Sequence, residues 1–261
     1  MYQTCPKCGH TRAQHDSSPP DRCPACGLLF QKWLRSQLRS ASTGQRPAPS
    51  ARAEHASITL ERVLATLVHV EPRVNAVEFW ARLVTFVGLS VWGVYFIFTD
   101  WAAEFGPFRE IGNSFMHRVN LVFHEAGHVL FIPLGDFMSV LGGSLGQLIM
   151  PAVVMVTFAF RYHNAFGASV GLWWLAQSLM DLAPYIGDAR RGELLLLGGV
   201  TGMDAPGYHD WSNLLARMGL LAKDRVYAAR VDTLGELLMW IAIAWGALVL
   251  YRQYRNVDRR I

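Results

Sequence analysis

The last two-thirds of the chain is a series of apolar blocks separated by shorter polar stretches. The blocks lie at residues 79–98, 115–134, 140–160, 168–187 and 234–251. Each is close to the ~20 residues that an α-helix needs to cross the hydrocarbon core of a bilayer. Trp80 and Trp101 flank the first block, as aromatic side chains do at membrane interfaces. The pattern predicts an all-α polytopic membrane protein with about five transmembrane helices.

The polar N-terminal part of the chain divides into three segments ahead of this domain. Residues 1–35 contain all of the cysteines. Residues 36–57 are rich in Ser, Ala, Pro and Arg with almost no large apolar side chain, which is typical of a disordered linker. Residues 58–71 place apolar side chains at helical spacing, which predicts an amphipathic helix on the membrane surface, ended by Pro72. Residues 72–261 are the predicted transmembrane domain.

The composition agrees with a membrane protein. Of 261 residues, 52% are hydrophobic and 17% are charged, whereas a soluble domain has about 25% charged residues. This excludes a collagen, a coiled coil and a wholly disordered chain. The formal net charge is +4. In so apolar a chain, this small basic excess is expected to orient the protein in the bilayer, and it gives no strong signal for nucleic-acid binding.

The cysteines form two C-x-x-C pairs: Cys5 with Cys8, and Cys23 with Cys26. Gly9 or Gly27 follows the second cysteine of each pair and allows a tight turn there. Four thiolates at this spacing are typical ligands of a tetrahedral structural zinc ion, so residues 1–35 are predicted to be a zinc ribbon. No apolar signal-peptide segment precedes the pairs, which indicates a reducing compartment. We expect the ribbon to lie in the cytosol and to bind a cytosolic protein partner.

One dense polar cluster, His124-Glu125-Ala126-Gly127-His128, lies inside the second apolar block. Residues four apart lie on one face of a helix, so His124 and His128 can bind one metal ion. Zinc takes neutral imidazole ligands, keeps a position for water and lowers the pKa of that water toward 7. Glu125 is then the general base that takes the proton from the zinc-bound water and gives it to the leaving amine. Ionisable groups in an apolar segment are costly, which favours a metal site over a buried polar contact.

Two histidines and a water leave room for one more protein ligand at membrane depth. Asp181 and Asp188 stand at the end of the fourth apolar block, on either side of Pro184. Pro184 and Gly187 are expected to unwind the helix where Asp188 turns inward. The alternative is that Asp188 only begins a cytosolic loop, whereas Asp181 lies deeper in the apolar run.

At these residues the chain resembles the site-2 protease family of intramembrane zinc metalloproteases. That family carries H-E-x-x-H in one transmembrane helix and Asn-x-x-Pro…Asp-Gly in a later one. The stretch 123–129 matches the first motif. The stretch 181–189 matches the second loosely, because Asp181 replaces the asparagine, Ala189 replaces the glycine and the spacing to the aspartate is one residue shorter.

The resemblance covers roughly residues 115–190 and implies a zinc-dependent intramembrane protease. By this match, Asp188 joins His124 and His128 as a zinc ligand, and Asp181 is polar support near the site. The differences from the family motif leave Asp181 as the other candidate for the third ligand.

Two glycine-rich stretches add further candidates. Gly142, Gly143 and Gly146 favour a close approach between helices over a re-entrant turn beside the site. The stretch 202–211 places His209 and Asp210 in a Gly/Pro loop. These two side chains are candidates for supporting groups or a gate on the cytosolic side of the zinc site, and the alternative is a solvated interfacial loop.

Charge gives a first topology. With a cytosolic ribbon and five helices, loops 99–114 and 161–167 lie outside and residues 188–232 lie inside, where most of the Lys and Arg residues occur. The basic C-terminal tail, residues 252–260, would then lie outside, against the same rule. Either residues 234–251 form a hairpin or the count of segments is wrong by one.

Taken together, the patterns predict an integral multi-pass membrane zinc metalloprotease, in the plasma or inner membrane if the source is bacterial. It would hydrolyse peptide bonds in or near the transmembrane segments of membrane-protein substrates, with one catalytic and one structural Zn²⁺. A membrane-anchored metallopeptidase of the soluble type is disfavoured, because no Glu-x-x-x-Asp follows His128. The alternative from another class is a non-enzymatic protease-like membrane scaffold or a metal transporter.

Overall fold

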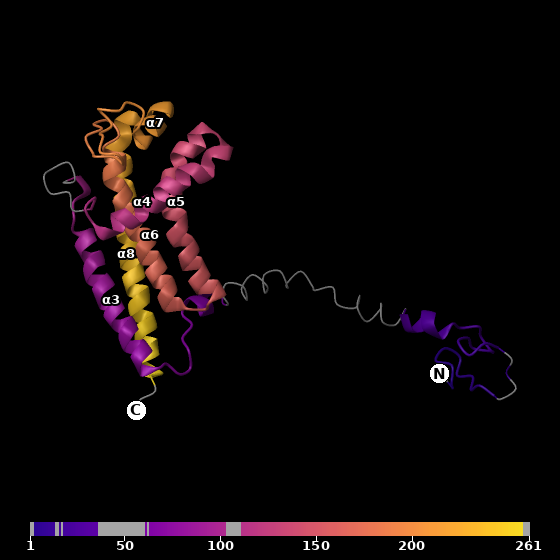
Figure 1. Ribbon diagram of the computed structural model, residues 1–261. Helices are drawn as coiled ribbons and strands as arrows, with labels where there is room; N and C mark the ends of the chain where they lie inside the picture. The colour runs from indigo at the N-terminus through magenta and orange to yellow at the C-terminus, as the bar shows by residue number, and fades with distance from the viewer. Residues whose placement is uncertain are drawn as a thin grey trace. The chain divides into compact units, whose positions relative to one another are not determined.

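The computed structural model describes residues 3–13, 16, 18–35, 61, 63–102 and 111–257. The chain divides into two compact units, residues 1–60 and residues 61–261 (Figure 1). The predicted linker, residues 36–57, lies outside the described residues. The predicted amphipathic segment is described from residue 61 onward, except residue 62, and is helical up to residue 67.

The first unit is built around its cysteines. Isolated antiparallel bridges join Thr4 to Thr11 and Arg22 to Leu29, one beside each C-x-x-C pair. A short helix, residues 30–35, begins with Phe30, whose buried ring packs against the cysteine side chains. The described residues of this unit contain bridges but no extended strand, so the ribbon itself stays a prediction.

The second unit is all-helical in its described residues, as the apolar blocks predict. Its main helices are α3 (Ala76–Ile97), α4 (Phe115–Phe131), α5 (Asp136–Val156), α6 (Ala165–Gly187), α7 (Asp210–Arg217) and α8 (Asp224–Arg255). A 3₁₀ turn, Ile132–Leu134, joins α4 to α5, and a π-helical turn, Thr157–Arg161, extends α5. A second 3₁₀ turn, Leu221–Lys223, leads into α8.

Three helices among the described residues are long and apolar enough to cross a membrane: Ala76–Ile97, Asp136–Arg161 and Leu221–Arg255. The helix that carries the H-E-x-x-H motif is not one of them. With 17 residues, α4 is about 26 Å long at 1.5 Å per residue, and it carries several polar side chains. The helix α6 is longer but lies inside the bundle with most of its side chains buried.

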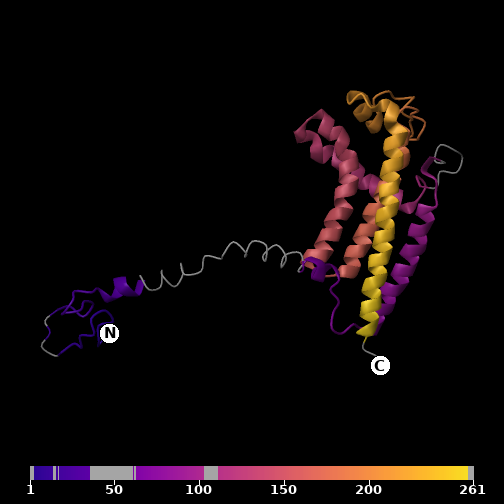
Figure 2. The ribbon, with the colours of Figure 1, turned by 180° about the vertical axis from the view of Figure 1, so that it is seen from behind.

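The two ends of the second unit meet. Val74 donates its backbone N–H to the carbonyl oxygen of Asn256 at 3.1 Å, and Val74 forms a parallel bridge with Val257. Figure 2 shows the C-terminal end of α8 beside the start of α3. The segment before the first helix and the residues after the last helix therefore share one end of the bundle. Three candidate spans are found among the described residues, and the predicted count of about five stays a prediction.

The same packing corrects the predicted loops. Trp101, which follows α3, packs against Gly187 at the end of α6, and its ring lies 5.6 Å from the guanidinium carbon of Arg225 at the start of α8. Residues 99–102 thus share one end with the loop that follows α6, instead of lying opposite it. Residues 234–251 are part of the single helix α8 and form no hairpin.

The helix α6 is the centre of the unit and contacts α3, α4, α5 and α8. Trp173 on α6 donates its indole N–H to the carbonyl oxygen of Leu89 on α3 at 2.8 Å. The helix continues through Pro184 to Gly187, and Asp188 is its C-terminal cap. The expected unwinding at Pro184 does not occur, because tight packing on all sides holds the helix geometry.

Glycines bring α4 and α5 into direct backbone contact. A Cβ atom at Gly127 would lie 2.1 Å from the carbonyl oxygen of Gly142, and one at Gly146 would lie 2.4 Å from the carbonyl oxygen of Phe123. Real Cβ atoms do not approach so closely, so only glycine fits at these positions. This confirms the close-packing interpretation of the glycine stretch, which lies within α5.

Candidate metal centres

The first candidate centre consists of the cysteines, whose sulfur atoms lie within 4.8 Å of one another. Cys5 Sγ lies 3.7 Å from Cys26 Sγ, and Cys8 Sγ lies 3.7 Å from Cys23 Sγ. Sulfur ligands about 2.3 Å from a tetrahedral zinc ion lie roughly 3.8 Å apart, so the sulfurs are spaced for one ion.

The backbone of the cysteine pairs supports this use. Gly9 and Gly27 have φ of 73° and 72°, the conformation that their place after each pair predicts. Desolvation disfavours the Cys5 thiolate. The backbone N–H groups of Cys8 and Lys7 nevertheless donate to its sulfur, and together with contacts from neighbouring thiols they lower the pKa of Cys5 to about 6. A backbone hydrogen bond from His10 lowers the pKa of Cys8, but contacts with Cys26 and the other thiols, together with desolvation, outweigh it and raise that pKa to about 12. The thiols thus share protons, which a bound cation would have to displace.

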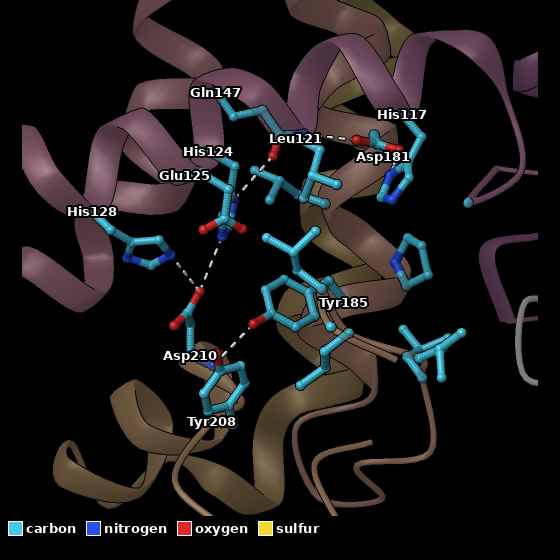
Figure 3. A pocket seen from close by; sticks show the side chains of 18 of the residues that line it. His117, Leu121, His124, Glu125, His128, Gln147, Asp181, Tyr185, Tyr208 and Asp210 are labelled. Atoms are coloured by element: carbon cyan, nitrogen blue, oxygen red, sulfur yellow. Dashed lines mark hydrogen bonds and ion pairs between the residues drawn. The ribbon is translucent and has the colours of Figure 1, made fainter. Parts of the chain in front are cut away.

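The second candidate centre joins His124, His128 and Asp210, whose ligand atoms also lie within 4.8 Å of one another. The Oδ2 atom of Asp210 lies 3.0 Å from His124 Nε2 and 3.2 Å from His128 Nε2. Figure 3 shows both imidazoles pointing from α4 toward this carboxylate. The two imidazole rings come from successive turns of one helix, with ring centroids 4.9 Å apart. The H-E-x-x-H spacing thus places its histidines as predicted.

The short helix α7 holds Asp210 in place. Asp210 is the first residue of α7, and its backbone N–H donates to the Tyr185 hydroxyl on α6 at 3.0 Å. On the α5 side, Trp211 donates its indole N–H to Ser144 Oγ at 3.1 Å, and Arg217 forms an ion pair with Asp136 at 2.5 Å. These contacts dock α7 across the ends of α5 and α6.

Each imidazole is oriented by a partner at its other nitrogen. His128 Nδ1 lies 2.9 Å from the carbonyl oxygen of Ser139, and His124 Nδ1 lies 3.3 Å from Gln147 Oε1. Both partners are acceptors, so each Nδ1 carries a proton, and each Nε2 would offer its lone pair to an ion bound between the imidazoles and Asp210. Histidines that bind metal ions are usually held in this way.

The Asp210 carboxylate is ionised in this setting. Burial raises its pKa, but hydrogen bonds and charge interactions with His124 and His128 outweigh this effect and lower the pKa of Asp210 to about 2. The hydrogen bond and charge of the same carboxylate raise the pKa of His128 to about 9, so an ion bound here would have to displace a proton from that imidazole. A carboxylate with two imidazoles that have lost this proton is a donor set that suits zinc.

Two observations test whether an ion fits between these groups. Ligands about 2.0 Å from a tetrahedral ion lie roughly 3.3 Å apart, and the two N···O distances of 3.0 and 3.2 Å agree with this spacing. Gly143 on α5 faces the same point, because a Cβ atom there would lie 2.5 Å from both Nε2 atoms. The missing side chain leaves space for an ion between the imidazoles, so the residues fit a metal.

Glu125 lines a cavity of about 690 Å³ that also contains the three ligand candidates (Figure 3). Its carboxylate forms no hydrogen bond or ion pair with any of the described residues. It is therefore available for proton transfer beside the metal group. Leu121, Leu182 and residues 194–197 line the same cavity and make much of its wall apolar.

The structure places Asp188 elsewhere than the family resemblance implies. Its side chain is fully buried, and its two oxygens accept hydrogen bonds from the backbone N–H groups of Glu193 and Leu194 at 3.0 and 2.9 Å. It does not share the metal-sized group with His124 and His128, where Asp210 takes the third position. The reason is that the loop after α6 folds back over Asp188, and backbone N–H groups of this loop occupy both oxygens of its carboxylate.

The remaining candidates support the site at different distances. His209 is the N-cap of α7, and its Nδ1 accepts the backbone N–H of Ser212 at 3.3 Å. Its Nε2 lies 3.4 Å from Asp188 Oδ2. Asp181 lines the cavity and contacts Gln147, the partner of His124. The sequence analysis does not single out Gln147 or Tyr185. A glutamine within an otherwise apolar block is the sequence signal that could have indicated Gln147.

No protein-family model, no curated protein and no solved structure matches this chain. The resemblance to the site-2 protease family therefore rests on its two sequence motifs alone.

Proposed function

We propose that the protein is a zinc-dependent intramembrane endopeptidase of the site-2 protease type. One observation carries this proposal: Asp210 completes a three-ligand group with His124 and His128, beside a carboxylate, Glu125, that has no structural partner among the described residues. Three protein ligands and an open position characterise catalytic zinc sites, whereas structural sites use four protein ligands.

The roles of the side chains follow from their positions. His124, His128 and Asp210 would hold the ion, which when bound would supply Lewis acidity to polarise a peptide carbonyl and to acidify water near neutral pH. Glu125 takes a proton from the attacking water and passes it to the leaving amine. Tyr185 fixes the backbone of Asp210 through its hydroxyl.

The proposed substrates are apolar segments of membrane proteins. The leucines at 194–197 would contact such a chain, and two of them, Leu195 and Leu197, are 60% and 54% exposed. The cavity belongs to a unit with three candidate membrane-spanning helices, so the proposed enzyme and a membrane-embedded substrate would lie in the same bilayer. We also propose that the first unit binds a structural zinc ion and docks a cytosolic protein partner.

Zinc content of the purified protein is the first test. We expect two zinc ions per chain, one at each candidate group. The Cys5→Ser/Cys8→Ser variant should lose one, and the His124→Ala/His128→Ala variant should lose the other. A single zinc that disappears only with the cysteines would mean that the histidine group is empty and would overturn the proposed function.

Activity is tested with Glu125→Gln, which keeps the size of the side chain but removes its basicity. Removal of a general base should slow peptide cleavage by about 10²-fold or more, with zinc content unchanged. The readout is cleavage of model transmembrane segments in proteoliposomes. If Glu125→Gln retains full biological function in cells, a scaffold or a metal transporter describes the protein better than a protease does.

A further inference from the structure

A buried glutamine lies between the metal group and a buried carboxylate. Gln147 on α5 is 4% exposed and Asp181 on α6 is 5% exposed. Gln147 Nε2 donates to Asp181 Oδ2 at 2.8 Å and to the carbonyl oxygen of Ser178 at 3.3 Å. Gln147 Oε1 lies 3.3 Å from His124 Nδ1. Figure 3 shows this chain of contacts running from Asp181 to the histidine.

These contacts allow only one direction of the Gln147 amide. The NH₂ group faces two acceptors, so it cannot also face His124. The amide oxygen therefore points to His124 Nδ1, and because this oxygen only accepts, the proton of His124 must be on Nδ1. Nε2 faces Asp210 Oδ2 at 3.0 Å, and an ion bound between them would take the Nε2 lone pair.

The carboxylate of Asp181 is itself fixed from other sides. His117 Nδ1 lies 2.9 Å from Asp181 Oδ1, and Asn120 Nδ2 donates to Asp181 Oδ2 at 3.1 Å. The direction of the Asn120 amide is set in turn, because its oxygen accepts from Trp174 Nε1 at 2.9 Å and Ser178 Oγ at 3.1 Å. Side chains from α4, α5 and α6 thus form one network with a single consistent set of donors and acceptors.

We propose that Gln147 and Asp181 are positioning residues of the metal centre, which set the tautomer and ring orientation of His124. His128 is oriented separately by the Ser139 carbonyl oxygen, so the network acts on one of the two imidazoles. The inference rests on the proposed function only in requiring a metal ion at His124 and His128.

The test measures metal affinity, with no need for a substrate. Gln147→Met keeps the length of the side chain but removes its hydrogen bonds. We expect it to weaken Zn²⁺ binding at the histidine centre roughly 10–100-fold in a chelator competition, as loss of an outer hydrogen-bond partner does. With Co²⁺ as a spectroscopic probe in the Cys5→Ser/Cys8→Ser background, the visible absorption bands should shift, because the His124 ring is free to rotate.

The matched control is Gln177→Met on α6. Gln177 is equally buried and accepts a hydrogen bond from Asn120, but it contacts neither histidine. A merely structural role for buried glutamines would make both variants alike, whereas positioning of His124 predicts wild-type Co²⁺ bands and affinity for Gln177→Met alone.

A second variant covers the case in which Gln147→Met does not fold. Asp181→Asn keeps the shape but removes the charge that the Gln147 NH₂ group binds, so the Gln147 amide, and with it the His124 ring, is held less firmly. A similar loss of affinity is expected. Wild-type affinity and Co²⁺ bands in folded Gln147→Met or Asp181→Asn would overturn this inference, while a wild-type protein without the histidine-bound ion would overturn the proposed function instead.

Discussion

The Oδ2 atom of Asp210 lies 3.0 Å from His124 Nε2, although 86 residues separate them in the chain. The same oxygen lies 3.2 Å from His128 Nε2. Two candidate ligands thus come from one helix and the third from a short helix that begins far along the sequence. The geometry of the centre therefore depends on how α7 is docked as much as on the H-E-x-x-H motif.

Matched substitutions of Asp210 and Asp188 show which of these two aspartates is the third metal ligand. Asp210→Asn removes a charged ligand, and we expect metal affinity at the histidine centre to fall by more than the roughly 10–100-fold that an outer partner is worth. Asp188→Asn should instead lower the stability of the metal-free protein by about 1–3 kcal/mol, because one buried backbone N–H loses its acceptor. The measurements are chelator competition and thermal unfolding. The opposite pattern, with metal lost only in Asp188→Asn, would restore the family assignment.

Gly143→Ala should empty the histidine centre. The new methyl group would lie 2.5 Å from both Nε2 atoms, in the volume that the ion needs, so the imidazoles must move apart. Zinc analysis should show loss of one ion while the cysteine-bound ion remains. Gly88→Ala on α3 is the control, because a Cβ atom there meets nothing within 4 Å. Retention of both zinc ions in Gly143→Ala would show that the ion, if present, binds elsewhere.

Tyr185→Phe removes the hydroxyl that accepts the Asp210 backbone N–H. We expect zinc affinity to fall roughly tenfold, since Asp210 keeps its side chain but loses part of its support. Tyr208→Phe is a matched control, because Tyr208 lines the same cavity but is 63% exposed. Equal zinc affinities of Tyr185→Phe and Tyr208→Phe would show that the Tyr185 hydroxyl does not support the metal group.

The shared end of the second unit predicts which positions lie on one side of a membrane. Single cysteines replacing Glu71 and Tyr254, in a chain whose native cysteines are serine, should react with an impermeant maleimide from the same side of sealed vesicles. A cysteine replacing Met203, which is 68% exposed in the loop after α6, should react from the other side. Labelling of positions 71 and 254 from opposite sides would contradict the pairing of Val74 with Asn256.

The sequence predicts local features of this protein well. The apolar blocks anticipate α3, α5 and α6, because burial in a membrane or a bundle needs long apolar runs. The C-x-x-C pairs and the H-E-x-x-H motif place their side chains together, since each needs only the geometry of a turn or of one helix. Residues 224–232, part of the predicted inner loop, instead form the first turns of α8.

Long-range features could not be read from the sequence. The third position of the histidine centre is decided by packing, namely the contacts of Trp211 with Ser144 and of Arg217 with Asp136. Asp188 is removed from the candidates by backbone N–H groups that have no sequence signature. The close contact of α4 with α5 is likewise a long-range feature, because it depends on glycines of both helices meeting.

The hydrogen bonds at the shared end of the second unit also set an order of assembly. The carbonyl oxygens of Leu67, Val68 and Glu71 accept from the side chains of Trp245, Arg252 and Asn256. During synthesis the segment with these carbonyl groups leaves the ribosome well before the residues of α8 that supply its partners. Until then its carbonyl groups depend on water or lipid headgroups. These hydrogen bonds can therefore form only after the C-terminal part of α8 has been made. A chain truncated before Trp245 would leave the carbonyl oxygens of Leu67, Val68 and Glu71 without these donors.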